Sequence, residues 1–151
     1  MLAYHRAMPD PTTISPAAEL SGEVLDFLRT PGRHAVIGTV DPDGSPHQAV
    51  TWYRLDGATV VVNSLVGRRW PANLMRDGRI SITVADGPDW VAIRGRVETV
   101  EDQPTAQADI AAMAHAYESP AEATISIARF RGQLRVSFRV RPDRVHTEIG
   151  A

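Results

Sequence analysis

The sequence has 151 residues, of which 43% are hydrophobic and 23% charged, the size and composition of one globular domain with a hydrophobic core. Its net charge of −2 argues against a general binder of nucleic acid or of anionic membranes. The chain has no cysteine, which excludes disulfides, thiol catalysis and zinc sites built on cysteine.

All 16 basic residues are arginine. A lysine Schiff base is therefore excluded, and with it the usual covalent attachment of pyridoxal phosphate. Any anion site has to use the planar forks of guanidinium groups or backbone N–H groups. We attribute the lack of lysine mainly to the bias of a GC-rich genome.

The first residues carry no visible targeting signal. Residues 1–15 lack the apolar core of a signal peptide, and no apolar run in the chain is long enough to cross a membrane. We therefore expect a cytoplasmic protein without a membrane partner. Residues 1–15 are expected to be a flexible N-terminal lead, and residues 16–151 a single domain.

The first predicted element is a helix. Ser15 and Pro16 are typical of a helix start, and Thr-Pro-Gly at 30–32 ends the pattern. Between them the apolar residues repeat on one helical face, namely Leu20, Val24, Phe27 and Leu28.

Runs of apolar and β-branched residues then predict six strands. The turn sequences Asp-Pro-Asp-Gly at 41–44 and Asp-Gly at 56–57 separate the first three strands. The six strands are expected at residues 34–40, 47–55, 58–64, 79–85, 90–100 and 133–149.

Helical patterns interrupt the strands at two places. A short helix is expected from about Trp70 to Asp77, and a longer one begins near Asp102 and keeps an apolar face as far as Tyr117. A helical or irregular segment follows from Pro120. The pattern predicts a mainly β protein, a six-stranded antiparallel barrel with flanking helices.

The common catalytic motifs are absent. The sequence has neither the glycine-rich nucleotide motifs nor the metalloprotease and hydrolase motifs. Its five histidines are scattered, and no pair of carboxylates indicates acid–base catalysis. We therefore nominate no metal ligand and no catalytic side chain. If the protein is an enzyme, a bound cofactor supplies the chemistry.

The stretch NSLVGRRWPANLMRDGR, residues 63–79, is the best candidate for a binding site. Arg68 and Arg69 precede a helix start, where free N–H groups and the helix dipole attract anions. Trp70 adds a flat apolar surface. The alternative is a surface corner in which these arginines pair with aspartates. Arg76, near the far end of the helix, is expected to complement the helix C-terminus.

Two further tryptophans have two possible roles. Trp52 lies within a predicted strand and Trp90 begins one. Each side chain is expected either to pack in the core or a dimer contact, or to wall a flat ligand at the rim of the barrel. For Tyr53, a buried structural role is the alternative to donating a proton to a substrate.

Taken in order, these stretches resemble one known family. They are AVIGTVDPDGSPHQAVTWYRLDG, VVVNSLVGRRWPANLMRDGRISITV, WVAIRGRVETVED and VRPDRVH. Their order and spacing are similar to those of the flavin- and deazaflavin-binding split β-barrel family, the pyridoxamine-phosphate-oxidase-like superfamily. The resemblance covers about residues 19–147 and implies an FMN-binding split-barrel fold.

Within that superfamily the chain most resembles the actinobacterial branch that uses the deazaflavin coenzyme F420. The resemblance implies a homodimer with two cofactor sites in grooves at the subunit interface. It implies that the phosphate and tail lie at Asn63, Ser64, Arg68, Arg69 and Asn73, and the ring system near His47, Val50, Thr51 and Trp52. Trp90 would line the pocket, from either subunit.

One position departs from the family pattern. Members often carry a lysine two residues after the first arginine of this loop, and here that position is Trp70. Either phosphate binding is weakened, or Arg69 replaces the missing cation. Pyridoxamine-phosphate oxidase activity itself is not expected, because the C-terminal segment lacks an arginine-rich tail for a second phosphate.

The resemblance implies an F420-dependent reductase that passes a hydride to a small unsaturated organic substrate. One alternative is an FMN-binding oxidoreductase of the same fold. Another is a protein that binds a cofactor or planar ligand without turnover, which fits the lack of catalytic side chains equally well.

Overall fold

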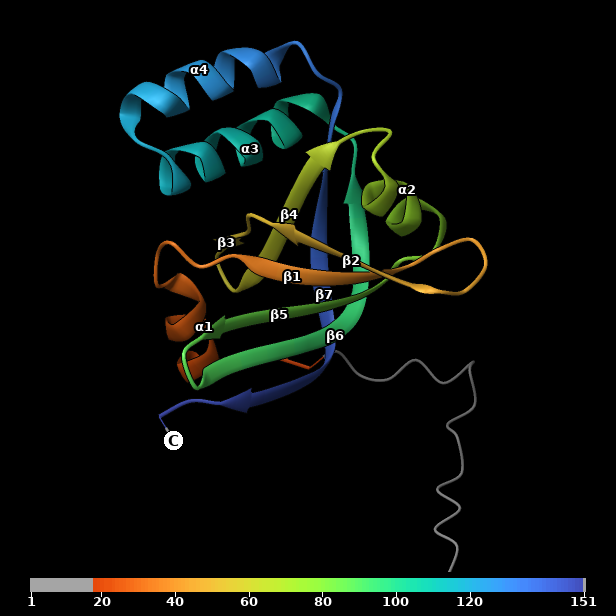
Figure 1. Ribbon diagram of the computed structural model, residues 1–151, viewed down its shortest axis with the longest axis vertical. Helices are drawn as coiled ribbons and strands as arrows, with labels where there is room; N and C mark the ends of the chain where they lie inside the picture. The colour runs from red at the N-terminus through yellow and green to blue at the C-terminus, as the bar shows by residue number, and fades with distance from the viewer. Residues whose placement is uncertain (1–17, 151) are drawn as a thin grey trace, which may run out of the picture.

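The computed structural model describes residues 18–150, which form one sheet of seven antiparallel strands with helices packed around it (Figure 1). The strand order is β2-β1-β5-β6-β7-β4-β3. In chain order the elements are α1 (Gly22–Arg29), β1 (Ala35–Val40), β2 (Pro46–Thr51), β3 (Arg54–Asp56), β4 (Thr59–Leu65), α2 (Arg69–Arg76), β5 (Arg79–Asp86), β6 (Asp89–Val100), α3 (Gln103–Tyr117), α4 (Pro120–Arg131) and β7 (Arg135–Glu148). The mainly β architecture with flanking helices is confirmed.

The helix starts follow capping residues. α1 begins after Ser21, whose Oγ accepts a hydrogen bond from Val24 N at 3.3 Å. The helix is therefore shorter than predicted: residues 18–20 are not helical, and Ser15 and Pro16 lie outside the described residues, as does the predicted lead. The segment after Pro120 is a regular helix, α4, capped by Ser119, which accepts from Glu122 N at 3.3 Å.

The prediction of six strands was wrong by one, because the run 47–55 is two strands. β2 pairs with β1, whereas β3 pairs with β4 at the opposite end of the sheet order. Between them, Trp52 and Tyr53 leave the ladder, and Tyr53 N donates to the hydroxyl of Tyr117 at 3.3 Å instead of to a strand. This corner carries the chain from one sheet edge to the other.

A β-bulge bends the longest pair of strands. Along β6 and β7 the pairing changes from Arg94 with Arg144 to Gly95 with Pro142, so β7 has one extra residue, Asp143, at this point. β6 is visibly curved, running beside β5 in its first half and beside β7 throughout (Figure 1). The bend lets a single sheet wrap around a core in the manner of a barrel.

The apolar core has two parts. The larger lies inside the curved sheet under α1 and α2, and includes Ile37, Val62, Ile82 and Phe138. The smaller lies between the sheet and the pair α3–α4 that covers it (Figure 1). It contains Val61, Ile110, Met113, Ala114, Ala123 and Phe130. β4 and the first half of β7 are therefore buried on both faces.

No helix within residues 18–150 has both the length and the apolar character needed to span a bilayer.

Gly95→Ala is expected to lower the free energy of unfolding by about 1–3 kcal/mol. A Cβ added at Gly95 would lie 2.1 Å from Arg141 O and 3.0 Å from the Cα of Pro142, and backbone cannot rotate away as a side chain can. Urea denaturation of both proteins measures the difference.

The matched control is Gly22→Ala at the first position of α1, where an added Cβ meets nothing within 4 Å. Alanine is a better helix former than glycine, so this variant should be as stable as the parent or more stable by up to about 1 kcal/mol. Equal stability of the two variants would show that β7 shifts freely at the bulge.

Candidate functional site

The corner between β2 and β3 is held in place by an aromatic pair. The indole of Trp52 stacks on the ring of Tyr117 from α3, with centroids 5.1 Å apart and an interplanar angle of 6°. The Tyr117 hydroxyl donates to Arg33 O at 2.6 Å, and burial raises the pKa of this hydroxyl. The stack fixes the end of β2 against the helical layer.

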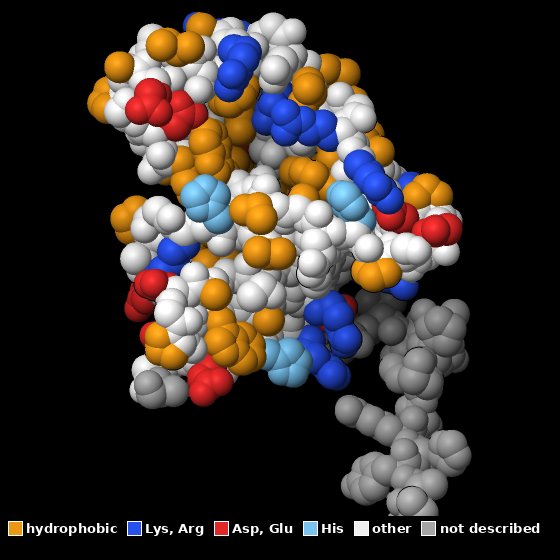
Figure 2. Space-filling view, in the orientation of Figure 1, with side chains coloured by type: hydrophobic (Ala, Val, Ile, Leu, Met, Phe, Trp, Pro, Cys, Tyr) orange, Lys and Arg blue, Asp and Glu red, His pale blue; other side chains and the backbone are white. Residues whose placement is uncertain are grey.

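A cavity of about 540 Å³ opens beside this corner, where α3 and α4 meet the ends of β2, β4 and β7. Figure 2 shows arginine side chains gathered where the helical layer meets the sheet. The cavity is lined by His34, Val50, Thr51, Trp52, Asn63, Arg68, Ile110, Arg129, Phe130, Gln133 and Arg135.

Three of these residues are cations from different elements. Arg68 is the N-cap of α2, Arg129 belongs to α4, and both are exposed, whereas Arg135 at the start of β7 is only 6% exposed. No carboxylate within residues 18–150 forms an ion pair with any of the three. Burial, and then the charges of Arg68 and Arg129, lower the pKa of Arg135 to about 10. Arg135 is therefore charged at neutral pH, and a cavity lined by three arginines favours anions.

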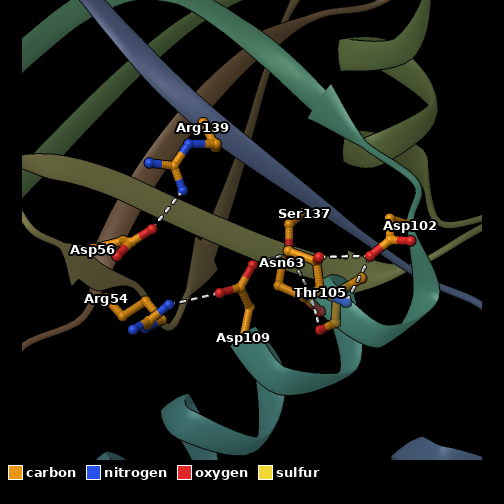
Figure 3. A network of polar contacts seen from close by, with 9 residues as sticks. Arg54, Asp56, Asn63, Asp102, Thr105, Asp109, Ser137 and Arg139 are labelled. Atoms are coloured by element: carbon orange, nitrogen blue, oxygen red, sulfur yellow. Dashed lines mark hydrogen bonds and ion pairs between the residues drawn. The ribbon is translucent and has the colours of Figure 1, made fainter.

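A chain of hydrogen bonds leads from Arg54 on β3, through Asp109 on α3, to Arg135. Arg54 Nη1 contacts Asp109 Oδ1 at 2.6 Å, and Ser137 Oγ donates to Asp109 Oδ2 at 2.7 Å (Figure 3). The hydroxyl of Ser137 in turn accepts from Asn63 Nδ2 at 2.8 Å. Asn63 Oδ1 accepts from Arg135 Nε at 3.0 Å. The side-chain polar groups of Asp109, Ser137 and Asn63 all have partners, as buried groups require.

Five of the sequence-predicted site residues lie together in the cavity lining: Val50, Thr51, Trp52, Asn63 and Arg68. Ser64 does not join them, because successive residues of a strand point to opposite faces. Its side chain turns toward the barrel core, where the hydroxyl has no partner among the described residues. His47 and Trp90 lie on β2 and β6, outside the lining.

The structure places three other predicted residues around Asp41 and the core. Arg69 binds the carboxylate of Asp41 with two hydrogen bonds, Nε to Oδ1 at 3.0 Å and Nη2 to Oδ2 at 2.5 Å. Asn73 donates to Asp41 Oδ1 at 2.9 Å. Trp70 is 7% exposed and packs on Phe138, with ring centroids 5.8 Å apart. Their assignment to a ligand stays a prediction.

Arg76 lies in the last turn of α2, where it donates to Asn73 Oδ1 at 3.1 Å and to the carbonyl of Val40. This ties the end of the helix to the end of β1.

Sequence reasoning missed the half of the cavity that α3, α4 and the start of β7 provide. The missed lining residues are His34, Ile110, Arg129, Phe130, Gln133 and Arg135. Arg135 alternates with Val136 and Phe138, a pattern typical of an outward-facing strand position, yet it is buried because α3 covers that face. A weak signal was its place shortly after a helix that ends with two arginines, Arg129 and Arg131.

The bent antiparallel sheet with helices packed on it is a split β-barrel. Residues 20–148 match the family described as pyridoxamine 5′-phosphate oxidase. The chain therefore belongs to this family, which includes oxidoreductases, and the split-barrel type predicted from the sequence is confirmed.

Solved structures agree with this assignment. The conserved hypothetical protein Rv2991 from Mycobacterium tuberculosis is 22% identical, with a TM-score of 0.69 over 87% of this chain and 85% of that one. A protein named F420 reductase is 25% identical, with a TM-score of 0.63 over 80% of this chain and 94% of that one. HupZ from Group A Streptococcus is 16% identical, with a TM-score of 0.61 over 87% and 96%. No curated protein matches the sequence.

The ion pair at the base of α2 predicts a stability change in acid. Hydrogen bonds from Arg69 and then Asn73 lower the pKa of Asp41 from the ordinary 3.8 to about 2. The carboxylate of Asp41 therefore takes up a proton more readily in the unfolded chain than in the folded protein. The ion pair stabilises the folded state above the ordinary pKa of 3.8, and this stabilisation is lost as the pH falls through the folded-state pKa of about 2. Asp41→Asn should flatten the decline of the thermal midpoint with falling pH in this range.

Arg69→Gln removes the stronger of the two donors to Asp41 and leaves Asn73 in place. Its midpoint should decline with acid less steeply than the parent's and more steeply than that of Asp41→Asn. If the thermal midpoint falls equally with pH in the parent, Asp41→Asn and Arg69→Gln, the ion pair of Arg69 and Asp41 does not stabilise the fold.

Proposed function

We propose that the protein is an F420-dependent reductase that transfers a hydride to a small unsaturated organic molecule. The observation that carries the proposal is a cavity whose lining combines three arginines without carboxylate partners among the described residues and Trp52, which is stacked on Tyr117. A phosphorylated, tricyclic cofactor has the same division into an anionic tail and a flat ring. Family membership and the 25% identity to a protein named F420 reductase support the choice of cofactor.

In this proposal the tail lies toward Arg68, Arg129 and Arg135, whose guanidinium groups suit phosphate and carboxylate oxygens. The ring lies toward Val50, Thr51 and Trp52, where backbone and apolar side chains can fix its orientation. A reduced deazaflavin, when bound, supplies the hydride. The chain contributes by binding it, aligning its ring with a substrate and excluding water from part of its surface.

Tyr53 takes a structural role in this proposal. It is 5% exposed, and its hydroxyl donates to Leu28 O at 2.7 Å. Burial raises the pKa of this phenol to about 12. Its proton is therefore held by the backbone of α1 and not directed at a substrate, which leaves orientation as the main contribution of the chain.

We also propose a homodimer formed through the outer face of β1, β2, β5 and β6. Val50, 68% exposed, lies beside Val36, 39% exposed, and the row continues through Thr83 and Ala92. This row carries no charged side chain, and apolar residues in such a position favour burial against a second copy. Because Val50 also lines the cavity, the second copy would lie close to the ligand.

Titration of the purified protein with F420, followed by cofactor fluorescence, is expected to give saturable binding in the micromolar range. Arg68→Gln should weaken binding about tenfold, because it removes a charge-assisted hydrogen bond. Arg131→Gln is the matched control, since Arg131 is exposed on α4 and outside the cavity lining. No binding at tens of micromolar would refute the proposal.

Parallel titration with FMN tests the alternative cofactor, whose single phosphate would suit the same arginines. Tighter binding of FMN, or a yellow protein as purified, would favour an FMN-dependent oxidoreductase. Single-turnover mixing of bound reduced cofactor with unsaturated substrates then separates a reductase from a protein that only binds the cofactor.

Val50→Glu is expected to convert the dimer to a monomer in light scattering after size exclusion, because two copies would bury carboxylates against one row of apolar residues. Ile125→Glu is the control: Ile125 is 71% exposed on α4, outside this row. A dimer that survives Val50→Glu would place the interface elsewhere.

A further inference from the structure

We propose that Arg135 is the floor of a phosphate subsite completed by Arg68 and Arg129, and that buried residues of β4, β7 and α3 position its guanidinium. The inference rests on the proposed function only in assigning the phosphate to a cofactor; the subsite itself follows from the contacts of Arg135. It adds two arginines to the residues expected from the sequence and names the network that holds one of them.

Arg135 is buried without a counter-charge. Other arginines of limited exposure have one: Arg33 contacts Asp86 at 2.6 Å, and Arg54 contacts Asp109 at 2.6 Å. Arg135 is 6% exposed and has no carboxylate partner within residues 18–150. A buried unpaired charge costs folding free energy, so a ligand anion is the partner this position lacks.

The hydrogen bonds of Arg135 leave one of its nitrogen donors free. Asn63 Oδ1 accepts from Nε at 3.0 Å, and Gln133 Oε1 accepts from Nη1 at 2.8 Å. The guanidinium carbon lies 4.8 Å from the centroid of the Phe130 ring. These contacts fix the guanidinium plane, yet no residue of the described chain accepts from Nη2. A planar fork with a free donor beside a cavity suits a phosphate oxygen.

The hydrogen bonds around Asn63 determine which end of its amide faces Arg135. Ser137 Oγ gives its proton to Asp109, so it can only accept from Asn63 Nδ2. The amide oxygen of Asn63 is thereby directed to Arg135. Asp109 is itself paired with Arg54, so its charge is not left to neutralise Arg135 (Figure 3). The network orients the cation and leaves its positive charge without a counter-ion.

Three like charges meet at the same place. Arg68 and Arg129 lie close enough to Arg135 for their charges to lower its pKa, after the larger effect of burial. The repulsion among the three guanidinium groups opposes folding. A function that needs these cations explains why the protein carries them in one place despite that cost. Binding of an anion should relieve the repulsion and stabilise the folded state by mass action.

The test is the thermal midpoint of the full chain in inorganic phosphate and in chloride, at equal pH and ionic strength. The parent protein should show a saturable rise in phosphate. Arg135→Gln should abolish the rise, and Arg129→Gln, a change at the exposed rim, should weaken phosphate binding several-fold. Arg131→Gln should respond like the parent, because Arg131 is exposed on the same helix but outside the cavity lining.

In the same titration, Ser137→Ala should weaken phosphate binding several-fold, because the Asn63 amide loses the hydrogen bond that fixes its orientation. Ser126→Ala is the matched control: Ser126 is also buried and donates to a carboxylate, Glu118 Oε2 at 2.8 Å, away from the cavity. Unchanged phosphate affinity in Ser137→Ala would overturn the positioning role.

A full phosphate response in Arg135→Gln would overturn the subsite. If Arg135→Gln does not fold, full phosphate responses in both single variants, Arg129→Gln and Ser137→Ala, would overturn the subsite instead. An equal response to acetate would overturn the assignment to phosphate. Failure of F420 and FMN to bind while the phosphate response persists would refute the proposed function alone. Binding of either cofactor without a phosphate response would refute only the subsite.

Discussion

The pairing of β4 with β7 is the element on which the rest of the structure depends. Val62 lies opposite Phe138, and both point into the barrel core, while the neighbouring pair of Asn63 and Ser137 points toward α3. Because successive side chains alternate between faces, one strand pair closes the core and supplies the polar floor of the cavity. Helices α3 and α4 cover the face that carries Asn63 and Ser137. Polar side chains on this face therefore have to form hydrogen bonds with one another or with a ligand.

The charges of the cavity follow from the same arrangement. A strand that is buried on both faces normally carries apolar side chains, yet the helix-facing side of β7 begins with Arg135 and continues with Ser137. Asp109 on α3 compensates Arg54 and not Arg135. The positive charge of Arg135 therefore has no counter-ion at the point where α2, α4 and β7 meet. Binding of an anionic ligand there would stabilise the folded state.

Much of the fold was predictable because its signals are local. Turn residues marked the hairpins: Asp56 pairs with Thr59 around Gly57, whose φ is 59°. The division of the run 47–55 was not predictable, because β-branched and aromatic residues continue through it and only its partners distinguish β2 from β3. The packing of Trp70 against Phe138 was not predictable either, since the sequence of a short helix does not indicate which neighbour its apolar face will meet.

The sequence by itself determined the order of strands and helices, the absence of lysine and cysteine chemistry, and one side of the cavity, because Val50–Trp52, Asn63 and Arg68 belong to a continuous family pattern. Only the tertiary structure decided which arginines form an ion pair with a carboxylate and which do not. Arg69 is adjacent to Arg68 in sequence, yet Asp41 neutralises it, whereas Arg135, distant in sequence, is left unpaired at the cavity. Ion pairing depends on distances of a few ångströms between residues far apart in the chain, and no local pattern encodes those distances.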